Sequence, residues 1–501
     1  MYQAGKHQDK QQKLSSRNWR NAVSVGATAL ATLFSAGCGN TYRPVVSAIN
    51  PVGPAGQPTK YAIAISNPAT NQAGLLTFVD FAGDTTLSTP SIFNNPSYFA
   101  QTISGTEGFV LNASGLFSDF GEGSPTSLLT TNIPQTTLPA GSGPVSISVI
   151  NVGSQGETIF VPEITTNKIA ELNVSGPSLI QELSVGASPV YVVGADGAAR
   201  AYAISQNTSG LGQVASIEAT TLSTSAVIPV GATPVYGVMT ADGKRAYIVN
   251  KGSASVSVLN VVNNALDTTS SIPVGVNPVW ADLSPLTNEL VVLNAGDGTT
   301  AGSLSIINIP LCTATTQTTN PNCDTNNPVD ATGFGTVLKT VSVGINPTMV
   351  SVLHDGSRAY VVNQQDSTSL CTSGEGSMTV VNLVDGVVET TICATSNTTS
   401  IATANGAPTL IYGHPNNVVA TTGSPTGKVY ITSPDSVFMT VLYTDTDSVQ
   451  THITLQGKGI ALPPNSAPSS NGAACGVGAA SATCLPNSTQ AQPVGLRITS
   501  P

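Results

Sequence analysis

The cysteines of this 501-residue chain have the most clearly defined chemistry, because most of them occur in neighbouring pairs. Leaving Cys38 aside, the pairs are Cys312 with Cys323, Cys371 with Cys393, and Cys475 with Cys484. Such pairs predict disulfides, which persist mainly in exported proteins. Proximity alone does not fix the connectivity, since six cysteines allow fifteen arrangements. No pair has the close Cys-x-x-Cys spacing with partnered histidines that zinc usually needs, so we expect no metal site.

The other reactive residue types show no pattern that predicts catalysis. The four histidines are His7, His354, His414 and His452, and each is expected in the leader, beside a turn or on an outer strand. No Gly-x-Ser-x-Gly elbow, phosphate-binding loop, His-Glu-x-x-His or haem-attachment motif occurs. The sequence therefore predicts neither an enzyme nor a bound cofactor.

The N-terminal segment has the features of an export signal. Five basic residues precede a weakly apolar stretch from Ala22 to Ala36, which ends in Ser35-Ala36-Gly37-Cys38. This resembles a secretory signal with a lipoprotein cleavage box, in which the thiol of Cys38 would carry a diacylglycerol. We expect residues 1–37 to be the signal peptide and 38–57 a tether to the membrane. The residue after Cys38 is Gly39 and not Asp, which is compatible with sorting to the outer membrane or cell surface. The alternative is an ordinary signal peptide in which Cys38 is incidental and carries no lipid.

Charge excludes one class of partner. Five of the 17 Lys and Arg residues and one of the 27 Asp and Glu residues lie in positions 1–37. The remaining chain has 12 basic and 26 acidic residues, which gives a net charge of −14. Nucleic-acid binding depends on clustered basic residues that neutralise phosphates. We therefore expect no nucleic acid partner.

A Gly-x-x-Pro element recurs along the chain and sets its organisation. Its prolines Pro144, Pro189, Pro234 and Pro278 lie 45, 45 and 44 residues apart, and Pro347 ends a further copy. A period of about 40 to 50 residues that holds several short β-runs has the size of one four-stranded propeller blade. The fold class predicted is therefore all-β, a β-propeller of four-stranded antiparallel blades.

Aligning the chain on these prolines brings other features into register. The run Ala246–Asn250 (Ala-Tyr-Ile-Val-Asn) matches Ala359–Asn363 (Ala-Tyr-Val-Val-Asn), and the pairs Asp242-Gly243 and Asp355-Gly356 precede them. Asp-Gly between β-runs favours a tight hairpin, because Gly accepts positive φ and Asp bonds its own backbone. These residues resemble the YVTN-type β-propeller repeat, which has the same Val-Gly-x-x-Pro and Asp-Gly-x-x-Ala-Tyr-Val pattern. The resemblance covers Gly141 to Asn363, although no copy reads Tyr-Val-Thr-Asn in full.

The strand pattern predicts eight blades within residues 59–499. Six groups start near Tyr98, Val145, Val190, Val235, Val279 and Thr348, and a seventh follows Pro415. Runs at 60–66, 75–81 and 85–92 lack a first strand, whereas 493–499 resemble a first strand without a blade. We expect the two ends to complete one blade, with Leu496 and Ile498 beside Tyr61 and Ile63, because closure removes unpaired sheet edges. Seven blades remain the alternative if the group near Tyr98 is not a blade.

Two insertions interrupt the period, at residues 311–335 and 461–492. Both are rich in polar residues and Pro, and each contains one cysteine pair.

The remaining cysteine pair, Cys371 and Cys393, is predicted to be bonded from its position in a propeller. Cys371 would lie in the loop between the second and third strands and Cys393 in the crossing to the next blade, and these loops emerge on the same face.

That face is the predicted binding surface, since loops held by a rigid scaffold commonly carry specificity. Its candidate residues are Asn250, Lys251, Asn294, Asp297, Asn363, Gln365 and Asp366. They offer donors and acceptors suited to a glycan or a protein partner.

The function predicted is a non-catalytic, lipid-anchored interaction or binding scaffold of the cell envelope. One alternative is a hydrolase similar to the lactonase-like propellers, although Arg200, Lys244, Arg245 and Arg358 all lie beside the expected first turn rather than on the loop-rich face. The other alternative is an adhesive or surface-layer component.

Overall fold

The computed structural model describes residues 61–66, 73–102, 107–112, 114–121, 133–151, 156–207, 210–240, 242–284, 289–309, 333–353, 355–368, 370–372, 374–395, 409–421, 427–455 and 492–494. All of them belong to one compact unit, Pro58–Pro501. The predicted signal peptide, Cys38 and the tether lie outside the described residues, as do Cys312, Cys323, Cys475 and Cys484. Within the described residues, no helix is long and apolar enough to cross a membrane.

Sheets whose strands pair antiparallel, with one short parallel pair, make up the fold. The first sheet has the order β3-β2-β1-β33 and contains β1 (Tyr61–Ser66), β2 (Ala73–Asp80), β3 (Thr85–Ser88) and β33 (Gln492–Val494), with β4 (Ser91–Asn94) also paired to β2. Five further sheets have four strands each. The first two consist of β5 (Pro96–Gln101), β6 (Glu107–Asn112), β7 (Leu116–Gly121) and β8 (Gln135–Thr137), and of β9 (Ser148–Asn151), β10 (Glu157–Glu163), β11 (Lys168–Asn173) and β12 (Leu179–Ser184). The next two consist of β13 (Pro189–Val193), β14 (Arg200–Ser205), β15 (Gln213–Glu218) and β16 (Thr224–Pro229), and of β17 (Pro234–Met239), β18 (Arg245–Asn250), β19 (Ser255–Asn260) and β20 (Ala265–Pro273). The fifth consists of β29 (Asn417–Thr421), β30 (Lys428–Thr432), β31 (Phe438–Tyr443) and β32 (Ser448–Thr454).

The remaining sheet joins two groups of four through one shared strand, and a short parallel strand at its edge brings the number of strands to eight. Its strands in order are β21 (Pro278–Ser284), β22 (Glu289–Asn294), β23 (Ala301–Asn308), β24 (Val337–Val352), β25 (Arg358–Gln365), β26 (Ser377–Asn382), β27 (Val387–Thr395) and β28 (Ile411–Tyr412). The first part of β24 pairs with β23 and the second with β25, and Ile345 pairs with both Ala301 and Gln365. The sequence predicted two separate strands here, on either side of Gly344-Ile345-Asn346-Pro347.

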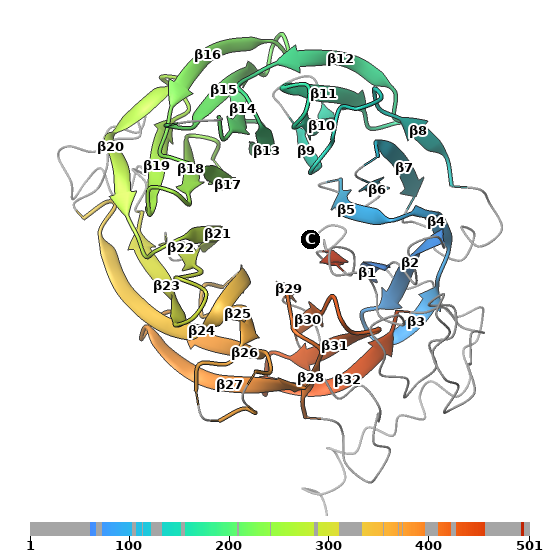
Figure 1. Cartoon of the computed structure of the whole chain (residues 1–501), viewed down its shortest axis with the longest axis vertical. Coiled ribbons are helices and arrows are strands. Elements are labelled where there is room, and N and C mark those ends of the chain that lie inside the picture. The colour runs from blue at the N-terminus through green and yellow to red at the C-terminus, as the bar shows by residue number, and fades with distance from the viewer. Residues whose placement is uncertain are drawn as a thin grey trace, which may run out of the picture. The chain divides into compact units, whose positions relative to one another are not determined.

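The sheets follow one another around a common centre (Figure 1), with β5, β9, β13, β17 and β21 innermost. Apolar clusters fill the spaces between neighbouring sheets. For example, Ile150 and Phe160 pack with Val192 and Ala201 of the next sheet. A comparable cluster joins Ala62, Ala64 and Phe81 of the first sheet to Tyr430 and Val441 of β29–β32. The second strand of each group is buried on both faces, which explains why these strands are almost continuously apolar.

The Gly-x-x-Pro element is explained by the crossing between sheets. The residue before each proline adopts positive φ: Ser188, Thr233, Asn277 and Asn346 have φ of 54°, 49°, 51° and 49°. The glycines lie against the strand that ends in Asn. A Cβ at Gly231 would lie 2.6 Å from Asn250 Cγ, and one at Gly344 would lie 2.5 Å from Asn363 Cβ. Since such distances do not occur for real Cβ atoms, a larger residue would displace this packing.

The predicted Asp-Gly hairpin turns are confirmed. Gly243 and Gly356 have φ of 66° and 73°. Asp242 Oδ1 accepts a hydrogen bond from the Lys244 N–H at 3.1 Å, and Asp355 Oδ1 accepts one from the Ser357 N–H at 2.9 Å. The carboxylates therefore stabilise their own turns, as the sequence pattern indicated.

Basic residues at the start of second strands connect neighbouring sheets. Arg200 Nη1 donates to the Val261 carbonyl at 2.7 Å, and Arg358 Nη1 donates to the Thr444 carbonyl at 2.8 Å. Both carbonyls belong to turns of the following sheet. Lys428 makes the corresponding contacts to the first sheet, where its Nζ lies 2.6 Å from Asp84 Oδ1 and also donates to the Phe81 carbonyl. These cations therefore have structural roles.

The two ends of the described chain pair with each other. β33 is antiparallel to β1, with Ile63 opposite Val494 and Ile65 opposite Gln492. Leu496 and Ile498, which the sequence predicted beside Tyr61 and Ile63, lie outside the described residues.

Candidate functional site

Three of the residues predicted on the binding face are buried instead. Asn250, Asn294 and Asn363 are 0%, 1% and 0% exposed. Their Nδ2 groups donate to hydroxyl groups of the next strand in their own sheet, for example from Asn250 to Ser257 at 3.0 Å and from Asn294 to Ser305 at 3.0 Å. The prediction that these asparagines present their amides to a partner was wrong. They fill the space beside the Gly-x-x-Pro glycines.

The other predicted binding residues lie nearer the surface, in separate loops. Lys251, Asp297 and Gln365 are exposed, and Asp366 is partly buried. The Asp297 carboxylate accepts hydrogen bonds from the N–H groups of Thr299 and Thr300, both at 2.8 Å, and these donors lower its pKa. Asp366 accepts a similar bond from the Thr368 N–H at 2.9 Å. Both carboxylates therefore shape their own loops, and no hydrogen bond described in the structure joins these four residues to one another.

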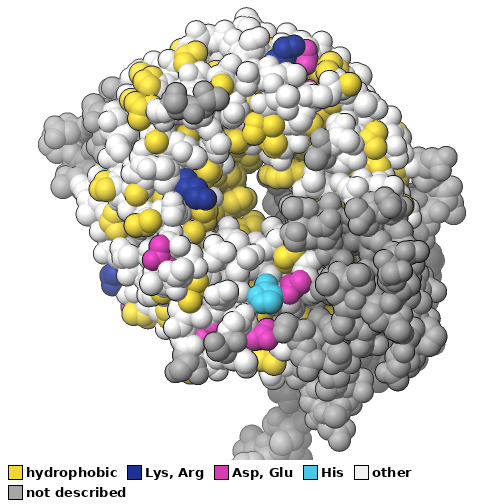
Figure 2. Space-filling view, viewed as in Figure 1, with side chains coloured by type: hydrophobic (Ala, Val, Ile, Leu, Met, Phe, Trp, Pro, Cys, Tyr) yellow, Lys and Arg dark blue, Asp and Glu magenta, His cyan; other side chains and the backbone are white. Residues whose placement is uncertain are grey.

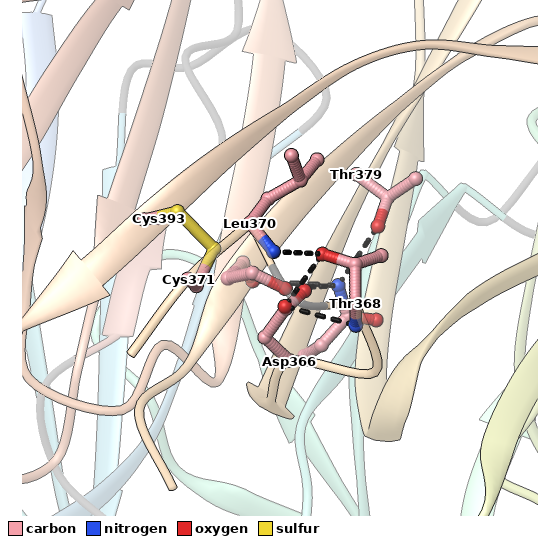
Figure 3. Close-up of a disulfide and its surroundings, with 8 residues drawn as sticks. Asp366, Thr368, Leu370, Cys371, Thr379 and Cys393 are labelled. Carbon is pink, nitrogen blue, oxygen red and sulfur yellow. Dashed lines mark hydrogen bonds between the residues drawn. A yellow bond between two sulfur atoms is a disulfide. The ribbon is translucent and has the colours of Figure 1, made fainter. Parts of the chain in front are cut away.

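A disulfide fixes the longest described loop on this face. Cys371 and Cys393 are bonded, with Cα atoms 5.3 Å apart, which confirms the predicted pair (Figure 3). On the same loop, the Gly374 carbonyl lies 3.2 Å from His414 Nε2, and His414 Nδ1 lies 2.6 Å from Asp435 Oδ2. Covalent and polar contacts therefore hold this loop against the following sheet.

Aromatic side chains gather on the innermost strands. Tyr191, Tyr236 and Trp280 come from β13, β17 and β21, and each stands two positions after the Pro that begins its strand. The ring centroids of Tyr236 and Trp280 are 4.0 Å apart at an interplanar angle of 14°, and those of Tyr191 and Tyr236 are 4.7 Å apart at 39°. Tyr98 occupies the equivalent position on β5. The repeat thus builds a row of aromatic rings across consecutive sheets.

This row borders a cavity of about 470 Å³. Its lining comes from β5, β9, β13, β17 and β21 together with Ile147, and includes Phe99, Val149, Val238 and Met239 beside the aromatic row. Figure 2 shows hydrophobic side chains around the central opening on this face. Cavities of this size, lined by aromatic side chains and a few polar groups, are typical small-molecule sites.

One carboxyl group lies among these rings. Asp282 lines the cavity, its Oδ2 accepts a hydrogen bond from the Val352 N–H at 2.8 Å, and its Oδ1 accepts one from the Leu283 N–H at 2.8 Å. Burial raises the pKa of Asp282 to about 6, although the two amide donors oppose that shift. The lining contains no Lys, Arg or His. A carboxyl with a raised pKa in a cavity is a feature of binding and catalytic sites.

The repeat itself contained the signal for this site. Ser146, Tyr191, Tyr236, Trp280 and Met349 stand two residues after the prolines of the Gly-x-x-Pro copies, and Tyr98 stands two residues after Pro96. Alignment on these prolines superimposes four aromatic residues, one serine and one methionine. The prolines predict the blades, whereas the column of residues two positions after them carries the signal for this site. Since the first strand of each group is innermost, that column faces the centre.

Comparison with known proteins supports the fold. No family model matches the chain, and no curated protein does either. Among solved structures, the chain is similar to the dihydro-heme d1 dehydrogenase NirN in complex with DHE (10% identity, 81% of this chain and 75% of that chain, TM-score 0.52). It is also similar to apo AztD from Citrobacter koseri (12% identity, 80% of this chain and 96% of that chain, TM-score 0.49). A further similar structure is a putative 6-phosphogluconolactonase from Bacteroides fragilis NCTC 9343 (14% identity, 68% of this chain and 97% of that chain, TM-score 0.45).

These neighbours are β-propeller proteins, and the chain is all-β with antiparallel sheets of the same kind. At 10% identity the likeness to NirN concerns the fold alone. The chemistry of the cavity therefore has to be argued from its own residues.

Proposed function

We propose that this protein is a non-catalytic binding propeller of the cell envelope, and that it binds a small ligand in the aromatic cavity. The observation that carries this proposal is the row of aromatic rings with a single carboxyl group beside it. Aromatic side chains combined with placed polar groups suit the capture and orientation of a small molecule. The loop face predicted from sequence is a weaker candidate, since three of its seven residues are buried.

The architecture we propose is a closed ring of eight blades related to the YVTN-type repeat. In support, the eight-stranded sheet divides at the shared β24 into β21–β24 and β24–β27, with β28 as an additional strand beside β27. The strands β5–β8, from the weakly patterned group that begins near Tyr98, form their own sheet. The pairing of β33 with β1 and the cluster between the first and last sheets support closure. In this architecture the innermost strands hold their aromatic residues at fixed positions around the centre.

For location, we propose export and anchoring through a lipid on Cys38. The disulfide between Cys371 and Cys393 is typical of an oxidising compartment. Lipid attachment, and an outer-membrane or cell-surface position, rest on the resemblance of residues 35–38 to a lipoprotein cleavage box. Mass spectrometry of the mature N-terminus tests this, because an unmodified terminus away from Cys38 would contradict it.

A hydrolase is the second candidate, and Asp282 is the observation that favours it. A partly buried carboxyl with a pKa of about 6 is suited to general-base catalysis near neutral pH. Turnover of the lactone dihydrocoumarin by the wild type, abolished in Asp282→Asn, would establish this alternative.

Trp280 provides a direct test of binding. The chain has two tryptophans, and Trp19 lies in the predicted leader, so Trp280 is the only one in residues 38–501. We would titrate residues 38–501 with four probes: phenyltrimethylammonium, tert-butylbenzene, benzoate and N-acetylglucosamine. The proposal predicts that at least one probe changes Trp280 fluorescence saturably.

The variants locate the binding site. Tyr191→Ser should weaken the response, and Ser146 already occupies the equivalent position on a neighbouring sheet, so the fold accommodates this residue. Lys251→Ala tests the rival loop face. If no probe binds, or if Lys251→Ala rather than Tyr191→Ser abolishes the response, the cavity is not the binding site.

A further inference from the structure

The cavity brings a row of stacked aromatic rings and one acidic group together, which narrows the chemistry of its ligand. The Tyr236 ring stacks on Trp280 and contacts Tyr191, and Asp282 follows Trp280 by two residues on β21. Alternate residues of a strand project to the same face of the sheet, so the Asp282 carboxyl and the Trp280 indole lie on the same face. This inference rests on the proposed function, because it concerns the ligand of the same cavity.

Asp282 is hydrogen-bonded but has no charged partner among the ion pairs described in the structure. Both of its described hydrogen bonds come from backbone amides, which are neutral. The ion pairs described in the structure join other residues: Lys168–Glu182, Arg200–Glu218, Arg245–Asp267, Arg358–Asp447, His414–Asp435 and Lys428–Asp84. A charged carboxylate in such surroundings is costly unless it is paired.

We infer that the cavity binds an organic cation, a substituted ammonium whose positive group lies beside Asp282 and against a ring at an end of the aromatic row. Tyr236 lies between Tyr191 and Trp280, so the faces of its ring are covered by its neighbours. Ring quadrupoles attract cations positioned over their faces, and such contacts strengthen when they are desolvated. The carboxylate supplies the countercharge. The alkyl or aryl substituents of the ligand would contact the apolar wall around Val238 and Met239.

Other ligand classes fit this lining less well. An anion would meet the charge of Asp282 without any Lys, Arg or His in the lining. A neutral sugar needs several hydrogen-bonding groups, and the Ser148 hydroxyl already donates to the Val192 carbonyl at 2.7 Å. A neutral apolar molecule would fill the cavity but leave the carboxylate without a countercharge.

The titratable groups of the cavity agree with a negatively charged lining at neutral pH. Asp282, with a pKa of about 6, is mostly ionised at pH 7.5. Burial raises the pKa of the Tyr98 and Tyr236 hydroxyls well above their ordinary value, so both remain neutral. The lining therefore carries the charge of one carboxylate and no other.

The decisive comparison uses phenyltrimethylammonium and tert-butylbenzene, which have the same shape and differ in charge. We expect the wild type to bind the cation at least about tenfold more tightly, measured by Trp280 fluorescence and by calorimetry at pH 7.5. Asp282→Asn should remove most of this preference. Asp385→Asn, which changes an exposed turn carboxylate, is the matched control and should retain the preference.

The outcomes separate the two proposals. Equal affinity for the charged and neutral probes, or tighter binding of benzoate, would overturn the cation inference while leaving the cavity as a binding site. Absence of binding by all four probes would overturn both. Melting curves show whether Asp282→Asn is folded, and the wild-type comparison of the two probes does not depend on any variant.

Discussion

At the level of single residues, the surroundings of two histidines determine their pKa and therefore their charge at neutral pH. Asp435 raises the pKa of His414 to about 9, whereas burial lowers the pKa of His452 to about 4. We predict that at pH 7.4 the His414 ring is charged and the His452 ring is neutral. A titration followed by imidazole NMR signals checks this, and Asp435→Asn should bring only the His414 pKa back toward 6.5. Two histidines that both titrate near 6.5 would contradict the described contacts.

The same pKa shifts determine the sign of the pH effects on stability. Because the folded-state pKa of His414 is raised, its stabilising contribution is complete below pH 6.5 and is lost as pH rises through about 9. The folded-state pKa of His452 is lowered, so its contribution is present above pH 6.5 and is lost as pH falls toward 4.

Residue patterns gave part of the candidate site. The bonded pair Cys371 and Cys393 could be predicted, although Cys393 lies in β27, opposite Ser377, and not in the crossing to the next sheet as expected. The Asn positions were misjudged, since a polar residue at a strand end suggests exposure, whereas Asn363 is held against Gly344, whose N–H donates to Asn363 Oδ1 at 3.0 Å. The environment of Asp282 could not be predicted, because its amide donor Val352 lies 70 residues away.

At the level of elements, buried ion pairs stabilise individual sheets and their contacts with neighbours. Arg245 is 0% exposed, its Nε lies 2.8 Å from Asp267 Oδ2, and its guanidinium lies 4.3 Å from the Phe334 ring centroid. Asp267→Ala should lower the free energy of unfolding by about 3 kcal/mol or more, since it removes the carboxylate beside a buried charge. Urea denaturation measures this change.

A more exposed pair serves as the control for that prediction. The side chains of Lys168 and Glu182 are 36% and 23% exposed, so Glu182→Ala should cost about 1 kcal/mol or less. If Asp267→Ala and Glu182→Ala destabilise the protein equally, burial does not determine the strength of these pairs.

The disulfide is a second stabilising element. Closing the 22-residue separation between Cys371 and Cys393 reduces the entropy of the unfolded chain, so the double variant Cys371→Ser/Cys393→Ser should lose about 3 kcal/mol. Thermal and urea unfolding measure this loss, with Thr372→Ser as a control in the same loop. Unchanged stability would show that the bond has no effect on the unfolded state.

Most strands could be predicted because each combines a β-branched run with turn residues at a fixed period. The run at 60–66 nearly matches β1, and the run at 75–81 overlaps most of β2. The continuous β24 was not predicted, since Gly and Pro usually end strands. It continues because Ile345 pairs on both sides, which depends on tertiary contacts that the local sequence does not show.

At the level of the whole molecule, the proposed closure of the ring depends on the pairing of β33 with β1. Removing residues 492–501 deletes β33 and leaves one edge of β1 without its partner strand. We predict faster amide exchange in Tyr61–Ser66 and a lower melting temperature, measured by hydrogen–deuterium exchange and calorimetry. A chain lacking only residues 499–501 is the control. Unchanged protection of β1 would contradict closure by the C-terminal strand.

The most direct test of the central claim is a crystal structure of residues 38–501 with 4-bromophenyltrimethylammonium, located by the anomalous signal of bromine. The account predicts one bromine peak inside the cavity bordered by Tyr191, Tyr236 and Trp280, with the ammonium group beside Asp282. A peak on the loops that carry Lys251 and Asp297, or no ordered peak, would contradict it.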